Sequence, residues 1–144
     1  MTSPTSSPTL SPVPSPTPSP SAGASAADLV AVAKVIFPYF PQYSYYSVCG
    51  ANGDLSACPV TDRLKTRLTR AYLTLCRCQN PALSFDVTAA PTQTGGVAHV
   101  ILGDQLPAKM DLVIVQTAGK LLVDDEICTG GGASTSIYVT DAPC

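Results

Sequence analysis

The side chains best suited to chemistry in this chain are six cysteines and one histidine. A thiol binds metal or attacks an electrophile as the thiolate, whereas thiols in an oxidising compartment pair as disulfides. Zinc sites usually combine Cys-x-x-Cys spacing with histidine. Here Cys76 and Cys78 are separated by one residue, and His99 is distant from them in sequence. The sequence therefore predicts structural disulfides, with no metal and no cofactor.

The positions of the cysteines favour one pairing among many. Cys49 and Cys58 flank a segment with turn-forming residues, so we expect them to pair with each other. Cys76 and Cys78 are too near each other to bond comfortably, and each is expected to reach a distant partner. On a helical wheel Cys78 lies nearer the buried face than Cys76. The expected disulfides are Cys49–Cys58, Cys78–Cys128 and Cys76–Cys144, with the swapped pairs Cys76–Cys128 and Cys78–Cys144 as the alternative to the last two.

An acid–base pair is a second possible chemistry. Strand alternation places Asp125 with Val123 and Ile127 on the face that resembles the core side. A carboxylate beside an apolar pocket has a raised pKa and can act as an acid or base, although such a group is more often held by backbone or a basic side chain. His99 lies on a predicted strand with two apolar faces, so the sequence does not determine toward which face its side chain points. Asp125 and His99 are the catalytic candidates, with a surface histidine as the alternative.

Aromatic residues are concentrated in one short stretch. Six of the nine aromatic residues lie between Phe37 and Tyr46, interrupted by two prolines. Such a stretch either lines a pocket, presents an exposed ridge, or plugs the space between helix and sheet. The candidate ligand-binding residues are Tyr39, Tyr43, Tyr45 and Tyr46.

The charge pattern excludes one class of partner. The net charge is −2 and the sequence pI is about 5.0, whereas nucleic-acid-binding proteins show a basic surplus. A basic stripe on the second predicted helix could bind an anion or an acidic partner, but a solvated face opposite the leucines explains it equally well. The stripe consists of Arg63, Arg67, Arg70 and Arg77.

These candidates sit behind a tail rich in serine, proline and threonine. Residues 1–23 are predicted to be a disordered, semi-rigid linker, because proline favours an extended helix with a rise of roughly 3.1 Å per residue. Residues 24–144 are predicted to form a single disulfide-bonded domain. Together with the cysteines, the linker predicts a secreted or cell-surface-anchored protein, from which a signal or lipid-anchor segment has been removed. No apolar run reaches the length of roughly 18 residues that spans a bilayer.

The hydrophobic pattern indicates the helices and strands that carry these residues. Helices are predicted from about residue 25, where Ser25 and Asp28 resemble a capping box, to residue 37 before Pro38, and from about 59 or 61, with Thr61 as a possible N-cap, to 76. A short strand is expected at 45–48. Helices followed by strands indicate an α+β fold with an antiparallel meander. The predicted strands are 83–90, 97–102, 109–116 and 120–128, with a last short strand at 137–140.

The second half of the chain resembles extracytoplasmic, lipoprotein-type members of the nuclear transport factor 2-like superfamily. The resemblance rests on strands Val97–Ile101 and Lys109–Gln116, followed by a Gly119-Lys120 turn into Leu121–Asp125. The family pattern typically reads Trp-x-Ile-Asp in the last strand, and here the tryptophan position is Leu121. The resemblance implies a cone, in which a curved antiparallel sheet wraps over N-terminal helices and encloses a pocket.

Two functions follow as expectations, because this fold does not by itself select one. The first is a non-enzymatic extracytoplasmic module that binds a small apolar ligand or a protein partner. The second is a small pocket enzyme of the isomerase or dehydratase type that uses Asp125 and His99. The enzyme requires Asp125, His99 and a tyrosine hydroxyl to converge on one cavity. A purely structural spacer domain is a third alternative, favoured if the domain has neither a pocket nor a large apolar surface patch.

Overall fold

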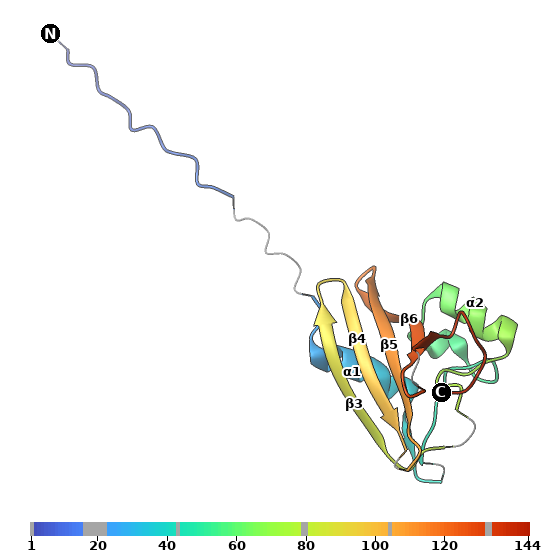
Figure 1. The fold of residues 1–144 in the computed structure, drawn as a ribbon. Helices are drawn as coiled ribbons and strands as arrows, with labels where there is room; N and C mark the ends of the chain where they lie inside the picture. The colour runs from blue at the N-terminus through green and yellow to red at the C-terminus, as the bar shows by residue number, and fades with distance from the viewer. Residues whose placement is uncertain (1, 16–22, 43, 79–80, 104, 132–133) are drawn as a thin grey trace.

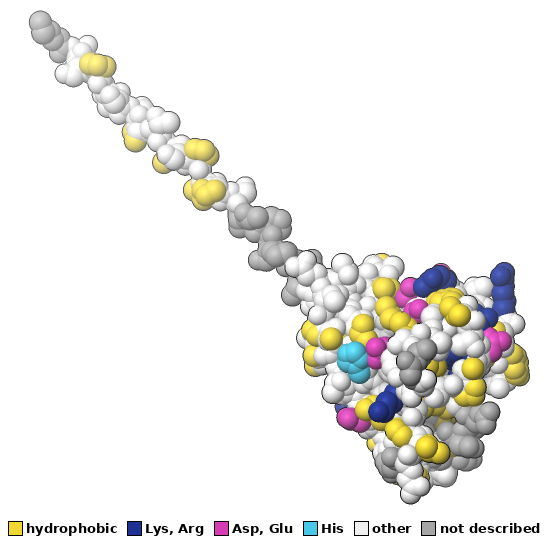
Figure 2. All heavy atoms as spheres, in the orientation of Figure 1, with side chains coloured by type: hydrophobic (Ala, Val, Ile, Leu, Met, Phe, Trp, Pro, Cys, Tyr) yellow, Lys and Arg dark blue, Asp and Glu magenta, His cyan; other side chains and the backbone are white. Residues whose placement is uncertain are grey.

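A computed structural model describes residues 2–15, 23–42, 44–78, 81–103, 105–131 and 134–144. Residues 2–15 form neither helix nor strand and are exposed, and Figure 1 shows them extending away from the folded part. No charged side chain occurs in this described arm, which appears in Figure 2 without blue or magenta spheres. An uncharged, proline-rich segment of this kind has too few apolar side chains to be buried in a hydrophobic core.

The first helix, α1 (Ala26–Ile36), begins at the predicted capping box, which is confirmed. The N–H of Asp28 donates to Ser25 Oγ at 3.1 Å, and the N–H of Ser25 donates to the Asp28 carboxylate at 2.9 Å. Pro38 restricts the residue before it, and the helix ends with Phe37 as its cap. The buried face consists of Leu29, Val32, Ala33 and Ile36.

The main sheet is a five-stranded antiparallel meander, as predicted, so the fold is α+β. Strand order follows chain order, and α1 lies against one face of the sheet (Figure 1). The inner face packs Ala98, Val100 and Leu112 into the same core as α1. The strands are β3 (Phe85–Thr92), β4 (Gly95–Leu102), β5 (Ala108–Thr117), β6 (Lys120–Cys128) and β7 (Thr135–Ser136).

Several predicted strand boundaries are wrong, including the end of β3 at Thr92 rather than at residue 90 and the start of β4 at Gly95 rather than at residue 97. The first long strand starts at Phe85 rather than at residue 83, because Leu83 is exposed and outside the ladder. The last short strand lies at 135–136 rather than at 137–140, because Thr135 and Ser136 are the described residues of this segment that pair with β6. Ile137 follows in a turn, where its side chain is completely buried.

Gly96, at the start of β4, has a backbone conformation that requires glycine. Its φ is +150°, and an added Cβ would lie 2.5 Å from the carbonyl oxygen of Ala90 and 2.6 Å from a methyl carbon of Leu29. We expect Gly96→Ala to lower the free energy of unfolding by about 2 kcal/mol, measured by urea denaturation with the disulfides intact. Gly131→Ala is the control, since a Cβ there meets nothing within 4 Å. Equal effects of both substitutions would contradict this interpretation.

The second helix, α2 (Asp62–Ala71), starts at the predicted cap but is shorter than predicted. Leu64 N–H donates to Thr61 Oγ1 at 3.3 Å, which is an N-cap bond. The helix ends because Tyr72 adopts a left-handed conformation with φ of 54°, and the predicted continuation to residue 76 is wrong. Leu75 is buried without being helical.

The aromatic stretch forms a small hairpin instead of the predicted strand at 45–48. Strand β1 (Tyr39–Phe40) pairs antiparallel with β2 (Ser44–Tyr45) in a separate two-stranded sheet. Tyr45 also exchanges backbone hydrogen bonds with Ala82, at 2.9 and 2.7 Å. The hairpin is therefore attached to the segment that leads into β3. A short 3-10 helix, Leu55–Ala57, precedes α2.

Candidate functional site

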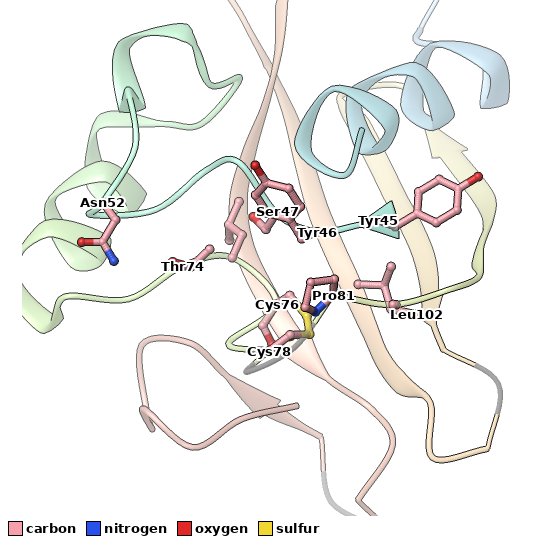
Figure 3. A pocket seen from close by; sticks show the side chains of 11 residues that line it. Tyr45, Tyr46, Ser47, Asn52, Thr74, Cys76, Cys78, Pro81 and Leu102 are labelled. Atoms are coloured by element: carbon pink, nitrogen blue, oxygen red, sulfur yellow. A yellow bond between two sulfur atoms is a disulfide. The ribbon is translucent and has the colours of Figure 1, made fainter. Parts of the chain in front are cut away.

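A cavity of about 290 Å³ opens between the aromatic hairpin and the segment that follows α2 (Figure 3). We call it the tyrosine pocket. Tyr46 lies at its wall, and Leu75, Pro81 and Leu102 supply apolar surface. Cavities that bind small molecules are lined in this way, with a few polar groups that fix orientation. The polar groups here come from Ser47, Asn52 and Thr74.

The candidate tyrosines divide between the pocket and its support. The Tyr45 ring is stacked on Phe85, with centroids 5.4 Å apart, and in Figure 3 it points away from the other lining side chains. Tyr46 is stacked on Phe40 at 4.8 Å, which fixes the orientation of its ring. Tyr39 is 59% exposed, packs on Tyr45 and does not itself belong to the described pocket lining. Tyr43 lies outside the described residues.

The cysteines adopt a different pairing from the one expected. The Cys49–Cys58 pair is present, with Cα atoms 5.8 Å apart. The expected Cys78–Cys128 and Cys76–Cys144 pairs are not, because Cys76 is joined to Cys78 and Cys128 to Cys144.

Backbone conformation explains the unexpected Cys76–Cys78 pair. Cys76 and Arg77 both have positive φ, 83° and 51°, and this tight turn brings the Cα atoms of Cys76 and Cys78 within 5.0 Å. Disulfides form readily at that separation. Cys76 and Cys78 do not lie on a helix face as expected, because α2 ends at Ala71 and these cysteines lie in a loop.

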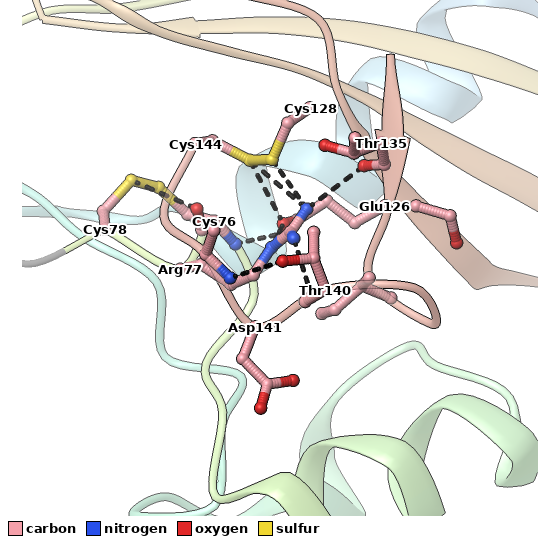
Figure 4. Close-up of polar contacts among 12 residues, drawn as sticks. Cys76, Arg77, Cys78, Glu126, Cys128, Thr135, Thr140, Asp141 and Cys144 are labelled. Carbon is pink, nitrogen blue, oxygen red and sulfur yellow. Dashed lines mark hydrogen bonds and ion pairs between the residues drawn. A yellow bond between two sulfur atoms is a disulfide. The ribbon is translucent and has the colours of Figure 1, made fainter. Parts of the chain in front are cut away.

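A buried ion pair lies beside this turn. The Arg77 and Glu126 side chains are 1% and 0% exposed, and Arg77 Nε donates to Glu126 Oε1 at 3.1 Å (Figure 4). The other carboxylate oxygen accepts a hydrogen bond from the N–H of Cys76. Arg77 also donates to the carbonyl oxygen of Thr140 at 3.0 Å and contacts Cys128 Sγ at 2.6 Å. The pair thus connects the turn, β6 and the C-terminal segment.

Burial raises the pKa of the Glu126 carboxyl above its ordinary value, and the Cys76 N–H and the Arg77 guanidinium oppose that shift. The carboxylate lies near the sulfur atoms of Cys128 and Cys144, all within 4.8 Å of one another. These sulfurs are bonded to each other and offer no thiolate to a metal ion. Glu126 is a structural group that was missed in the sequence, although three consecutive acidic residues in a strand were a signal.

The predicted alternation of inward and outward side chains along β6 is wrong, so Asp125 lies on the face opposite to the one expected. Val113 pairs with Asp125 and Ile114 pairs with Val123, so Asp124 is the extra residue of a β-bulge. A bulge moves every later side chain to the opposite face. Glu126 is therefore the acid on the core side, and Asp125 lies on the outer face. There its carboxylate accepts hydrogen bonds from Ser136 Oγ, at 2.7 and 2.9 Å.

His99 also lies on the outer face of the sheet. Its Nδ1 is 2.7 Å from a carboxylate oxygen of Asp111, its cross-strand neighbour on β5, and the imidazole is 48% exposed. Neither His99 nor Asp125 belongs to the lining of the tyrosine pocket. The convergence that the pocket-enzyme alternative requires is therefore absent from that pocket.

The arginines predicted to form one basic stripe separate in the structure. Arg63 pairs with Asp124 at 2.6 Å and lies over the ring of Tyr138. Arg67 donates to the carbonyl oxygen of Ile137 and pairs with Asp141. Together with the buried Arg77, these two side chains hold the C-terminal segment and β6 against α2. Arg70 is exposed.

No helix in the described residues is long and apolar enough to cross a bilayer. The cysteines lie at disulfide distance, which is the arrangement of proteins in oxidising compartments. No protein-family model, curated protein or solved structure matches this chain.

Proposed function

We propose that this protein is an extracytoplasmic binding module, carried on its proline-rich arm, that takes a small apolar ligand or an apolar side chain of a protein partner in the tyrosine pocket. The observation that carries the proposal is the combination of a stacked aromatic ring, an apolar wall and three short polar side chains around one cavity. Its volume of about 290 Å³ is at the low end for ligand sites, which favours a single ring over an extended molecule.

Three cross-links and the uncharged arm support the extracytoplasmic part of the proposal. The likeness to the nuclear transport factor 2-like superfamily belongs to the same proposal. It is supported by an antiparallel sheet with α1 on its inner face and by the bulge at Asp124, since bulges increase the local bending of a sheet. Binding is favoured over catalysis because the described lining of the pocket includes neither His99 nor Asp125.

Phenol and indole are suitable probes because each is one apolar ring system with one hydrogen-bonding group. We expect both to cause saturable amide chemical-shift changes in the ¹⁵N-labelled full chain, concentrated at Tyr46, Thr74 and Leu75. Tyr46→Ala removes the aromatic wall and should weaken binding by roughly threefold to tenfold.

Val139→Ala is the control, because Val139 is 78% exposed and absent from the pocket lining. It should bind both probes with the affinity of the unaltered chain. Shifts that do not saturate, or that map to the outer face around His99, would overturn the assignment of this pocket.

A further inference from the structure

The tyrosine pocket contains a disulfide with two very different sulfurs. Cys76 is 1% exposed, whereas Cys78 is exposed at the protein surface, and both belong to the lining. Figure 3 shows this pair next to Pro81 in the pocket wall. Exchange of a disulfide depends on which sulfur an incoming thiolate can reach. Cys78 is the exposed residue of the pair, which makes its sulfur the expected point of attack and Cys76 the leaving sulfur.

Cys78 also borders a second cavity of about 370 Å³. The two cavities share Cys78, Pro81, Ala82 and Leu102, so the exposed sulfur lies where they meet. The second cavity continues past Leu106, which is 97% exposed. A peptide can lie across this junction with apolar side chains in both cavities and one side chain directed at the sulfur. The surroundings of Cys78 therefore suit a cysteine flanked by apolar residues.

The backbone at this disulfide is under strain. Cys76 and Arg77 are consecutive non-glycine residues in the left-handed region, which such residues adopt rarely and at a cost. This disulfide closes the shortest loop of the three bridges, with one residue between its cysteines. It therefore lowers the conformational entropy of the unfolded chain least. Strained backbone of this kind concentrates at functional sites. These features distinguish the pair from Cys49–Cys58 and Cys128–Cys144.

We propose that Cys76–Cys78 is a thiol–disulfide exchange site whose substrate is a peptide thiol flanked by apolar side chains. The substrate thiolate attacks Cys78 Sγ, forming an intermolecular S–S bond as the Cys76–Cys78 bond breaks. The electron pair of the broken bond stays on Cys76, whose thiolate takes up a proton. A second substrate thiolate attacks the bound substrate sulfur and releases Cys78. Two substrate thiols are oxidised to a disulfide, and the protein pair is reduced to a dithiol.

The proposal goes beyond ligand binding and can fail independently of it, because it concerns sulfur exchange rather than probe affinity. The full-length oxidised protein is treated with a pentapeptide whose cysteine is flanked by leucine and phenylalanine. Samples are quenched with acid, alkylated and mapped by mass spectrometry. We expect Cys76 and Cys78 to become alkylated at least about tenfold faster than the other four cysteines. Reduction of either other bridge first, or of all three together, would overturn the proposal.

Single substitutions test which sulfur is attacked. Cys76→Ser leaves the exposed Cys78 as a thiol, and Cys78→Ser leaves the buried Cys76, so the two variants form a matched pair. With Ellman's reagent, the first should release thionitrobenzoate at least about tenfold faster than the second. Equal rates would contradict Cys78 as the point of attack. The mapping of the unsubstituted protein decides the main claim even if either variant fails to fold.

Discussion

Replacing Arg77 by methionine is expected to lower the free energy of unfolding by about 3–5 kcal/mol, the largest loss that we predict. The substitution leaves the Glu126 carboxyl completely buried without its guanidinium partner. It also removes the hydrogen bond to the carbonyl oxygen of Thr140, which anchors the C-terminal segment. Urea denaturation with the disulfides intact measures the change.

Two further variants separate the effect of losing the Arg77–Glu126 ion pair from the effect of a smaller side chain at residue 77. In the double variant Arg77→Met with Glu126→Leu no charge is left buried, so part of the loss should be recovered. Its stability should stay about 1–3 kcal/mol below the original, because the Cys76 N–H and the Thr140 carbonyl oxygen lose their hydrogen-bond partners. Arg70→Met is the matched control on an exposed arginine and should change the free energy by no more than about 0.5 kcal/mol. A loss below 1 kcal/mol in Arg77→Met would contradict the buried pair.

Removal of the Cys128–Cys144 bridge should have the second largest effect. The bridge closes a loop with a sequence separation of 16 and fixes the segment that carries β7 and Ile137. Replacing both cysteines by serine should cost about 3 kcal/mol in the chain-entropy description. The same double replacement at Cys76 and Cys78, where the separation is 2, should cost about 1 kcal/mol.

The difference between these two double variants can be measured in one urea series without reductant. The Cys128 and Cys144 variant should unfold at a clearly lower urea concentration than the Cys76 and Cys78 variant. The reverse order, or equal midpoints, would show that the turn at residues 76–78 carries the stability instead.

Local signals were sufficient to predict much of the fold. The capping box at Ser25, the proline after α1 and the turn residues between long apolar strands are short-range features, and each gives α1 or the meander directly. The strand boundaries were less accurate, because Leu83 has the composition of a strand residue while lying outside the ladder. Pairing with a neighbour, rather than composition, determines where a strand begins.

The candidate site was predicted poorly, and two backbone irregularities explain why. The bulge at Asp124 reverses the alternation that made Asp125 appear to be the inner acid, and nothing in a period-two pattern marks an inserted residue. Consecutive left-handed residues at Cys76 and Arg77 allow a bridge that spacing appeared to exclude. Left-handed positions are usually marked by glycine or asparagine, and neither residue is present there.

Arg77 also differs from its prediction, because its side chain is buried rather than exposed. Its place among the other arginines indicated an exposed basic stripe, but the helix ends at Ala71 and the side chain turns inward to Glu126. The aromatic stretch was informative in a different way, because two of its residues, Tyr45 and Tyr46, line a cavity. Which tyrosine lines the cavity and which supports it depends on stacking with Phe40 and Phe85, and no local pattern specifies that.

Tryptic mapping of the unreduced protein tests the pairing on which the site depends. Trypsin cleaves after Arg77, so an intact Cys76–Cys78 bridge leaves peptides 71–77 and 78–109 joined. Peptide 121–144 contains no lysine or arginine and carries both other cysteines of the cluster. We predict that it appears alone, lighter than its reduced form by the two hydrogens of a disulfide. Its linkage to peptide 71–77 or 78–109, or the recovery of six free thiols from folded protein, would contradict the bridged pocket and its exported setting.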